Sequence, residues 1–250
     1  AGYRLSYPDE KLFTFYLDEF ETKLFDLPEG VYTCLIENED CEEQILTPGM
    51  DDEIFSRTKV PMTKNEVRVL SISRLELTKK AVVYDVGSGT GSVSAECARL
   101  SHDIVVFAIE QKEEAANLTK ENAARLGLSD QIMVINKKAP EGFEELPTPT
   151  HVFIGGSSGV LSDILSAIQK KLIVKENTKG VRVVINAVSL ETIAQITKLI
   201  QTYPVKHVQL TQIQASRAHK LGSYNLMQAQ NPVLIASFNL LPDDKMEADE

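Results

Sequence analysis

Short apolar runs rich in valine and isoleucine alternate along the chain with segments that have the period of an amphipathic helix. The apolar runs before residue 190 cover 81–87, 103–110, 132–139, 150–156 and 181–188. The helical segments cover 64–77, 92–100, 112–127, 160–172 and 190–203. Unbroken apolar strands between helices are typical of parallel strands that helices cover on both faces. The pattern therefore predicts an α/β fold with a mostly parallel sheet, and Thr63 is the expected N-cap of its first helix.

The last two apolar runs, 206–217 and 231–240, have no helical segment between them. Parallel neighbours need a long crossover, so these two strands are expected to pair antiparallel as a hairpin at one edge. The expected sheet then has seven strands.

Bulk properties of the chain narrow its class. No apolar run reaches the ~18 residues of a membrane span, and "AGYRLSYPDE" lacks the basic and then apolar order of a signal peptide. Cys34, Cys41 and Cys97 do not have the spacing of a metal site, so free thiols in a reducing cytoplasm are expected. The predicted class is a cytoplasmic globular protein with no bound metal and no membrane partner.

The net charge of −10 is unevenly distributed. Residues 1–53 contribute −12 and the last eight residues −4, which leaves residues 54–242 with a net charge of +6. Broad nucleic-acid binding by the whole chain is not expected from this balance, whereas an anionic substrate on the central part is compatible with it. Uneven surface charge without any function is an equal alternative.

Residues 1–46 read as an acidic strand-and-loop segment, with a predicted strand over 30–39 and a predicted linker that ends near Pro48-Gly49. A segment of this length has too few apolar residues to fold alone. It is expected either to pack on the main domain, residues 47–250, or to be the remainder of a preceding one.

The first strand of the main domain runs into a glycine loop, "YDVGSGTGSVSAE" at 84–96. Gly87, Gly89 and Gly91 have the spacing G-x-G-x-G, whereas dinucleotide sites use G-x-G-x-x-G. Asp85 is expected to face the loop, and its carboxylate suits a cationic ligand better than a pyrophosphate. The loop resembles the S-adenosylmethionine loop of Rossmann-like class I methyltransferases. Glu110 ends the next strand, where a carboxylate can accept both ribose hydroxyls of either cofactor.

Several further motifs narrow the choice of substrate. "FIGGSSG" at 153–159 replaces the Pro-Pro-aromatic run of enzymes that methylate base amino groups, and its glycines leave a roomy rim. Together with "KVPMTKNEVR", "APE", "NAVSLET" and "QASRAHKLGSYNLMQAQNPVLI", the two loops resemble the decarboxylating precorrin-6Y methyltransferases of cobalamin biosynthesis, the CbiT type, over residues 48–240. Residues 1–46 resemble more weakly the end of the CbiE-type domain that precedes this one in fused enzymes.

The resemblance implies methylation of carbon 15 of a precorrin or cobalt-precorrin, with loss of carbon dioxide from the acetate at carbon 12. Activity at carbon 5 is not expected, because most of the first catalytic domain is absent from the chain. The tetrapyrrole itself can supply the nucleophilic carbon and the electron sink, so the protein mainly positions groups. The family also implies a homo-oligomer, a tetramer, and no nucleic-acid partner.

The resemblance also assigns site residues. Contacts to S-adenosylmethionine are expected from Thr63, Asp85, Gly87, Ser88, Gly89, Thr90, Gly91, Glu110 and Ala139, with Ala139 beside the adenine. Lys59, Arg217 and Asn186 are the catalytic candidates, and substrate contacts are expected from Gly155, Gly156, Glu191, His219 and Lys220. For Glu191 a stabilising position in the first turn of a helix is an equal alternative. Lys137-Lys138 stands where relatives commonly have Gly-Asp, so a carboxylate for the adenine amino group is missing.

Two other functions remain open at this point. Some tRNA adenosine methyltransferases share the loop and the sheet, although a charge of +6 is modest for an RNA-binding face. A non-catalytic subunit that binds S-adenosylmethionine would fit the Lys137-Lys138 departure.

Overall fold

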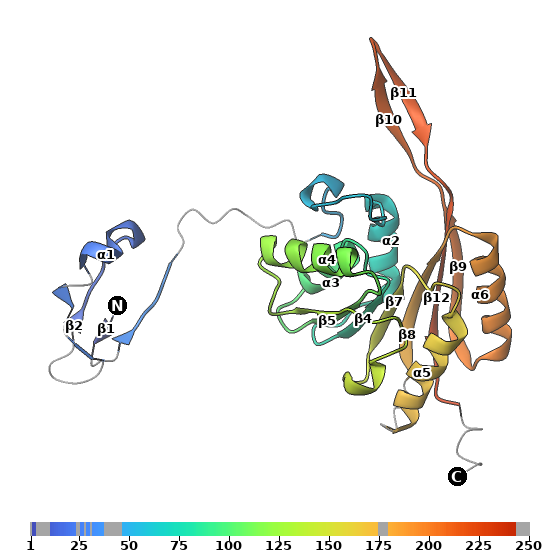
Figure 1. Cartoon of the computed structure of the whole chain (residues 1–250), viewed down its shortest axis with the longest axis horizontal. Helices are drawn as coiled ribbons and strands as arrows, with labels where there is room; N and C mark the ends of the chain where they lie inside the picture. Colours follow the sequence, from blue (N-terminus) through green and yellow to red (C-terminus); the bar gives the residue numbers. More distant parts are fainter. Residues whose placement is uncertain are drawn as a thin grey trace. The chain divides into compact units, whose positions relative to one another are not determined.

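The computed structural model describes residues 2–3, 11–23, 26–27, 29–30, 32–37, 47–174 and 180–243. The chain divides into two compact units, residues 1–45 and residues 46–250 (Figure 1).

The first unit is built from very short elements. Strands β1 (Gly2–Tyr3), β2 (Lys11–Leu12) and β3 (Tyr32–Thr33) form an antiparallel sheet in the order β2-β1-β3. A 3-10 turn at Leu17–Glu19 leads into α1 (Phe20–Lys23). The strand expected over 30–39 is reduced to β3 within the described residues, and part of the expected range lies outside them. None of the described side chains of this unit is buried.

The second unit contains a seven-stranded sheet in the order β6-β5-β4-β7-β8-β12-β9. Its strands are β4 (Val82–Val86), β5 (Val105–Ile109), β6 (Ile132–Ile135), β7 (His151–Ile154), β8 (Val181–Ala187), β9 (Val205–Ile213) and β12 (Val233–Leu240). Strands β4 to β8 are parallel, and β12 runs antiparallel to both β8 and β9. The predicted fold class, with its antiparallel edge, is confirmed.

Helices cover both faces of this sheet (Figure 1). They are α2 (Asn65–Leu75), α3 (Ser92–Ala98), α4 (Glu113–Arg125), α5 (Leu161–Val174) and α6 (Leu190–Thr202). Side chains alternate along a strand, so Val83 joins a core with α2, α3 and α4 while Tyr84 joins a second core with α5 and α6. These two cores hold the carboxyl ends of the parallel strands at one edge.

The predicted first helix starts one residue later than expected, and its N-cap was assigned wrongly. Lys64, not Thr63, occupies the N-cap position of α2. The carbonyl of Thr63 instead accepts a hydrogen bond of 2.7 Å from Arg68 Nη1, which holds Thr63 in the segment before the helix.

The prediction of one strand over 206–217 was also wrong. Strand β9 ends at Ile213, and β10 (Ser216–Leu221) and β11 (Tyr224–Ala229) form a separate hairpin, called here the arm. The arm projects from the body of the second unit (Figure 1). Its strands pair with each other around a two-residue turn in which Gly222 has φ +60°. Half of its strand residues are apolar, yet all but one of the twelve are exposed, so the arm lies outside either core.

Two further findings concern membrane spans and cysteines. Within the described residues no helix is long and apolar enough to cross a membrane. Cys97 is buried and Cys34 exposed, both as free thiols, and Cys41 lies outside the described residues.

Candidate functional site

A cavity of about 1660 Å³ opens at the carboxyl ends of the parallel strands in the second unit. One wall is residues 47–64, called here the strap, and another is the glycine loop after β4. The ends of β5, β7 and β8 and the base of the arm complete the lining. This edge is where open α/β sheets bind ligands, because loops from neighbouring strands converge there.

The glycine loop touches two other walls of this cavity. Gly87 and Gly89 have φ values of +74° and +58°, which side-chain-bearing residues rarely adopt. A Cβ at Gly87 would lie 2.8 Å from the backbone N of Gly156, and one at Gly89 would lie 2.8 Å from the carbonyl O of Pro61. Glycine therefore lets the loop backbone pack against the end of β7 and against the strap, and it leaves bare backbone facing the cavity.

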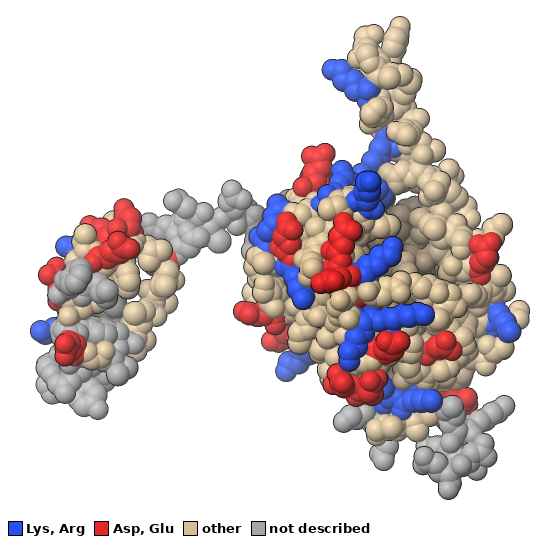
Figure 2. All heavy atoms as spheres, viewed as in Figure 1, with Lys and Arg blue, Asp and Glu red and all other residues tan. Residues whose placement is uncertain are grey.

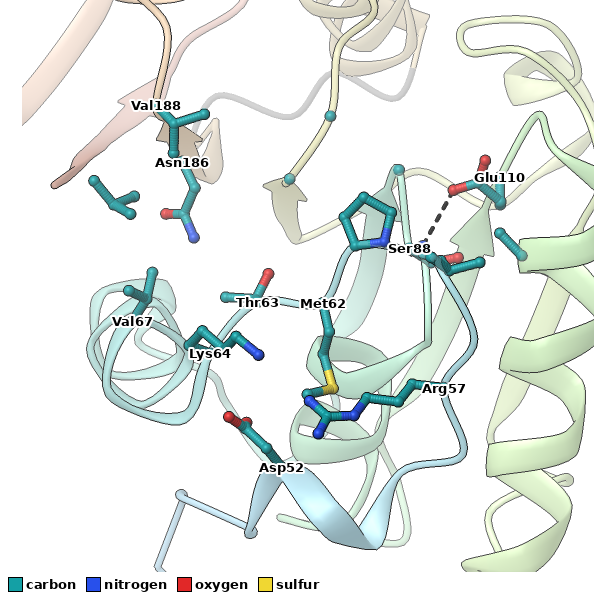
Figure 3. A pocket seen from close by; sticks show the side chains of 18 of the residues that line it. Asp52, Arg57, Met62, Thr63, Lys64, Val67, Ser88, Glu110, Asn186 and Val188 are labelled. Atoms are coloured by element: carbon teal, nitrogen blue, oxygen red, sulfur yellow. Dashed lines mark hydrogen bonds between the residues drawn. The ribbon is translucent and has the colours of Figure 1, made fainter. Parts of the chain in front are cut away.

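Glu110 follows β5 and faces the glycine loop (Figure 3). Its Oε2 accepts a hydrogen bond of 3.1 Å from the N–H of Gly89, and its Oε1 accepts one of 2.9 Å from the N–H of Lys112. Each carboxylate oxygen can accept more than one hydrogen bond. Glu110 is thus held in one orientation and keeps acceptor capacity for hydroxyl groups of a ligand.

Asp85 lies beneath the loop instead of facing the cavity, so the expected orientation was wrong. The alternation of β4 directs its side chain to the same face as Val83, toward α3, where Ser94 Oγ donates a hydrogen bond of 2.5 Å to Oδ2. Burial raises the pKa of Asp85 to about 6. Its Oδ1 is buried and has no hydrogen-bond partner among the described residues.

Asn186 and Thr63 both line the cavity (Figure 3). Asn186, the last but one residue of β8, is half-buried, and its Nδ2 donates a hydrogen bond of 2.9 Å to Ser71 Oγ. Val67 and Val188 lie beside it (Figure 3). This part of the cavity therefore combines one neutral amide with apolar surface.

Arg217, at the base of the arm, lines the cavity but is already engaged with two carboxylates. Its Nε and Nη2 each lie 2.7 Å from a carboxylate oxygen of Glu66, and its Nη1 lies 2.9 Å from Asp52 Oδ2. The hydrogen bond from Arg217 lowers the pKa of Glu66. Arg217, a catalytic candidate from the sequence, is therefore already paired with two carboxylates of the chain.

Most of the predicted site residues come together in this cavity. It is lined by Lys59, Thr63, Gly87, Ser88, Gly89, Glu110, Ala139, Gly155, Gly156, Asn186, Arg217 and His219. Five do not line it: Asp85, Thr90 and Gly91 are buried around the loop, whereas Glu191 and Lys220 are exposed on α6 and on the arm. Glu191 lies in the first turn of α6, which agrees with the alternative interpretation that its carboxylate stabilises this helix.

Basic residues that the sequence analysis did not single out also line the cavity. Arg57 and Lys112 join Lys59, Lys137 and Lys138 around it. Lys137 Nζ lies 3.5 Å from a carboxylate oxygen of Glu145. Figure 2 shows basic side chains around a hollow on this face of the second unit. The cavity is also lined by Asp51, Asp52, Glu53, Glu110 and Glu114, so its basic residues only slightly outnumber its acidic ones. The basic part of the lining is compatible with a ligand that carries several carboxylates.

The sequence and the fold both match known proteins. A family model described as a precorrin methyltransferase domain matches residues 53–239. A relative from Pyrobaculum calidifontis named cobalt-precorrin-6B C(15)-methyltransferase (decarboxylating) is 38% identical over 191 residues, which cover 76% of this chain and 94% of the relative.

Two solved structures agree with this match. The precorrin-6Y C5,15-methyltransferase of Geobacter metallireducens superposes with a TM-score of 0.70 at 30% identity, covering 77% of this chain and 97% of that one. The precorrin 8w decarboxylase of Methanobacterium thermoautotrophicum gives 0.68 at 31% identity, covering 76% of this chain and 100% of that one.

Proposed function

The chain belongs to the precorrin methyltransferase family, and on that premise we propose that it methylates carbon 15 of a precorrin and decarboxylates the acetate at carbon 12. S-adenosylmethionine would be the methyl donor, and the reaction would belong to cobalamin biosynthesis. The observation that carries the proposal is the cavity in which the glycine loop, Glu110 and a basic rim face one another.

The residues at the glycine loop fit S-adenosylmethionine. Because Gly87 and Gly89 have no side chains, a ligand can approach their backbone closely. The free acceptor capacity of Glu110 suits ribose hydroxyls. The unpartnered Oδ1 of Asp85 leaves negative charge beneath the loop that favours a cationic ligand. When bound, the cofactor would supply an electrophilic methyl group. Thr63 from the strap and Ala139 are proposed to contact it, with Ala139 beside the adenine.

Lys137-Lys138 lies on the adenine side of this arrangement and supplies no carboxylate. A backbone carbonyl is therefore proposed as the acceptor for the adenine amino group. Both lysines line the same cavity, and Lys138 is proposed to contact an anionic substrate there, whereas Lys137 is paired with Glu145.

The substrate is proposed to bind through the basic rim. Arg57, Lys59 and Lys112 line the cavity together with the two lysines, and their side chains suit the peripheral carboxylates of a tetrapyrrole. Gly155 and Gly156 leave room for the flat macrocycle, and His219 would contact it from the base of the arm. These groups bind and orient the substrate and exclude water from the reacting atoms.

Decarboxylation is proposed to occur beside Asn186. A carboxylate held against Val67 and Val188, with one neutral amide as hydrogen-bond donor, is solvated less than in water. That environment raises the free energy of the carboxylate relative to the products, which are carbon dioxide and a macrocycle over which the negative charge is delocalised. No proton donor is required for the departure of carbon dioxide itself.

Residues 1–46 are proposed to be the tail of a CbiE-type domain, and the chain is proposed to act in the cytoplasm as a tetramer, by family resemblance. Light scattering on a size-exclusion column measures the assembly directly. A monomer at micromolar concentration would contradict the tetramer.

Calorimetric titration with S-adenosylmethionine is the first test, with Gly89→Arg and Gly127→Arg as paired variants. Gly127 is exposed, and apart from its chain neighbours no described residue has an atom within 4 Å of the position that its Cβ would occupy. Gly127→Arg should therefore bind as wild type while Gly89→Arg should not. Turnover is then measured on a precorrin by mass spectrometry, as a gained methyl group and a lost carboxyl group. No saturable binding by the wild type would contradict the proposal, and binding without turnover would leave a non-catalytic subunit.

A further inference from the structure

The strap supplies one wall of the cavity although it has little regular structure. Within residues 47–64 one 3-10 turn, Asp52–Ile54, is formed. Lys59, Pro61 and Thr63 of the strap nevertheless face the glycine loop or the cavity. Because no sheet ladder or long helix holds this segment, side-chain contacts must set its position.

Many of those contacts converge on Arg68 of α2, whose side chain has no exposed surface. Its Nη1 donates 2.7 Å to the carbonyl O of Thr63 and lies 3.1 Å from Asp52 Oδ1, and its Nη2 donates to the carbonyl O of Met50. The guanidinium also lies over the ring of Phe55, 5.1 Å from its centroid. Arg68 therefore contacts both ends of the strap and its middle.

Glu96 of α3 completes the attachment at the start of the strap. Its Oε1 accepts hydrogen bonds of 2.9 and 2.7 Å from the N–H groups of Gly49 and Met50, and also contacts Arg68 Nε at 3.2 Å. Glu96 is fully buried. Arg68 thus keeps a second carboxylate partner that does not belong to the strap.

Asp52 connects this buried group to the opposite wall of the cavity. One of its oxygens binds Arg68 and the other binds Arg217 Nη1 at 2.9 Å. Arg217 stands at the start of the arm and is also paired with Glu66 of α2. A single carboxylate, 7% exposed, therefore joins the strap, α2 and the base of the arm.

We propose that Asp52 is a positioning residue: by bridging Arg68 and Arg217, it holds the strap and the base of the arm as facing walls of the cavity. Removing its charge leaves each arginine with a carboxylate outside the strap, Glu96 or Glu66, so the fold is retained. The strap, however, loses its ion pairs with Arg68 and Arg217. The functional consequence assigned to Asp52 rests on the proposed function of the cavity.

Asp52→Asn tests this, because asparagine keeps the shape and removes the charge. Hydrogen–deuterium exchange of the protein without ligand should accelerate about tenfold or more in peptides covering 47–63 and 214–221, as expected for local opening. Peptides from β4 and β5 should exchange as in the wild type. Asp103→Asn, an exposed carboxylate before β5, is the control for net charge and should change neither region.

Cofactor and substrate measurements then separate positioning from chemistry. Asp52→Asn should raise the Kd for S-adenosylmethionine about tenfold and should raise KM more than it lowers kcat, since Asp52 is not proposed to touch the reacting atoms. The exchange measurement needs no ligand. If the wild type does not bind S-adenosylmethionine, the proposed function fails while the exchange result still judges the bridge.

Two outcomes would overturn the proposal. One is unchanged exchange in the strap of Asp52→Asn, and the other is faster exchange throughout the sheet. If Asp52→Asn does not fold, Arg217→Met breaks the same bridge from the more exposed side and must loosen 47–63 and 214–221 together. Loosening of the arm peptide alone would contradict the bridge.

Discussion

Gly89 combines a positive φ with a close neighbour, and the two constraints have separable effects. Any residue with a Cβ at φ +58° is strained by about 1–2 kcal/mol. At Gly89 the added Cβ would also meet the carbonyl of Pro61 in the strap at 2.8 Å. Gly127 has φ +68°, but among the described residues other than its chain neighbours none has an atom within 4 Å of its own Cβ position. The pair therefore distinguishes backbone strain from displacement of the cavity wall.

We expect Gly89→Ala and Gly127→Ala each to lower the free energy of unfolding by about 1 kcal/mol or more. Gly89→Ala alone should also weaken S-adenosylmethionine binding, by about tenfold or more, because the loop and the strap must separate. Urea denaturation and calorimetry measure the two effects. Equal Kd values for the two variants would show that the contact with Pro61 has no role in binding.

The raised pKa of Asp85 predicts that the free energy of unfolding depends on pH. Its pKa in the folded protein, about 6, is above the ordinary value of 3.8 because burial disfavours the charged form. The folded state therefore binds the proton more tightly than the unfolded state, and stability falls as the pH rises from about 4 to about 6. Above pH 6 the whole cost of ionising a buried carboxyl is present.

Asp85→Asn should accordingly raise the free energy of unfolding at pH 8, by up to roughly 3 kcal/mol, and should change it little at pH 4. At pH 8 the same variant should bind the cationic cofactor more weakly, since the charge beneath the loop is lost. Urea denaturation of both proteins at the two pH values provides the comparison. A stabilisation that is the same at pH 4 and pH 8 would mean that ionisation of Asp85 is not its cause.

At the scale of elements, the arm illustrates a hairpin that forms without joining the sheet. Each of its strands pairs with the other from Ser216↔Ala229 to Leu221↔Tyr224. Leu221, Tyr224 and Met227 are all more than half exposed. The tip therefore contributes little to either core, whereas the base carries Arg217 and His219 at the cavity.

Shortening the arm should separate these two parts. Deletion of Lys220, Leu221, Tyr224 and Asn225 keeps the Gly222-Ser223 turn and the pairing of His219 with Leu226. We expect Tm to change by no more than about 2 °C, because hardly any buried apolar surface is lost. The Kd for S-adenosylmethionine should stay within about twofold of the wild type, as expected for changes far from the ligand. A large fall in Tm, measured by calorimetric scanning, would indicate that the tip is packed against something.

At the scale of the whole molecule, both hydrophobic cores lie within residues 46–250. The described part of the first unit has strands of two residues and no buried side chain. Such a segment buries too little apolar surface to stabilise the rest of the chain.

A protein consisting of residues 47–250 should therefore fold alone. We expect its Tm to lie within about 2 °C of that of the full chain, with the same affinity for S-adenosylmethionine. Loss of folding or binding in the shortened protein, followed by circular dichroism and calorimetry, would show that the first unit supports the second.

The order of strands and helices and the place of the site were predictable from the sequence because both depend on short-range patterns. Apolar periodicity is repeated within each element, and the glycine spacing from Gly87 to Gly91 lies within five consecutive residues. The carboxyl edge of the sheet then gathers the loop, Glu110 and Asn186 without further information. Within the described part of the second unit, the β10–β11 hairpin was not predicted, although Gly-Ser between two alternating stretches is a known turn signal.

Tertiary structure alone decided which charges are free and which are paired. Arg217 pairs with Glu66 and Asp52, which are 151 and 165 residues away in the sequence. Arg68 can lie on the buried face of α2 because Asp52 and Glu96 neutralise its charge there. No local pattern reports such partners, since they become neighbours only when strap, helix and arm pack together. Asp85 combines both influences: the alternation along β4 places its carboxylate on the face of Val83, beneath the loop, and packing brings Ser94 of α3 there as its hydrogen-bond donor. Local periodicity thus determined the scaffold of this protein, whereas long-range packing determined its electrostatics.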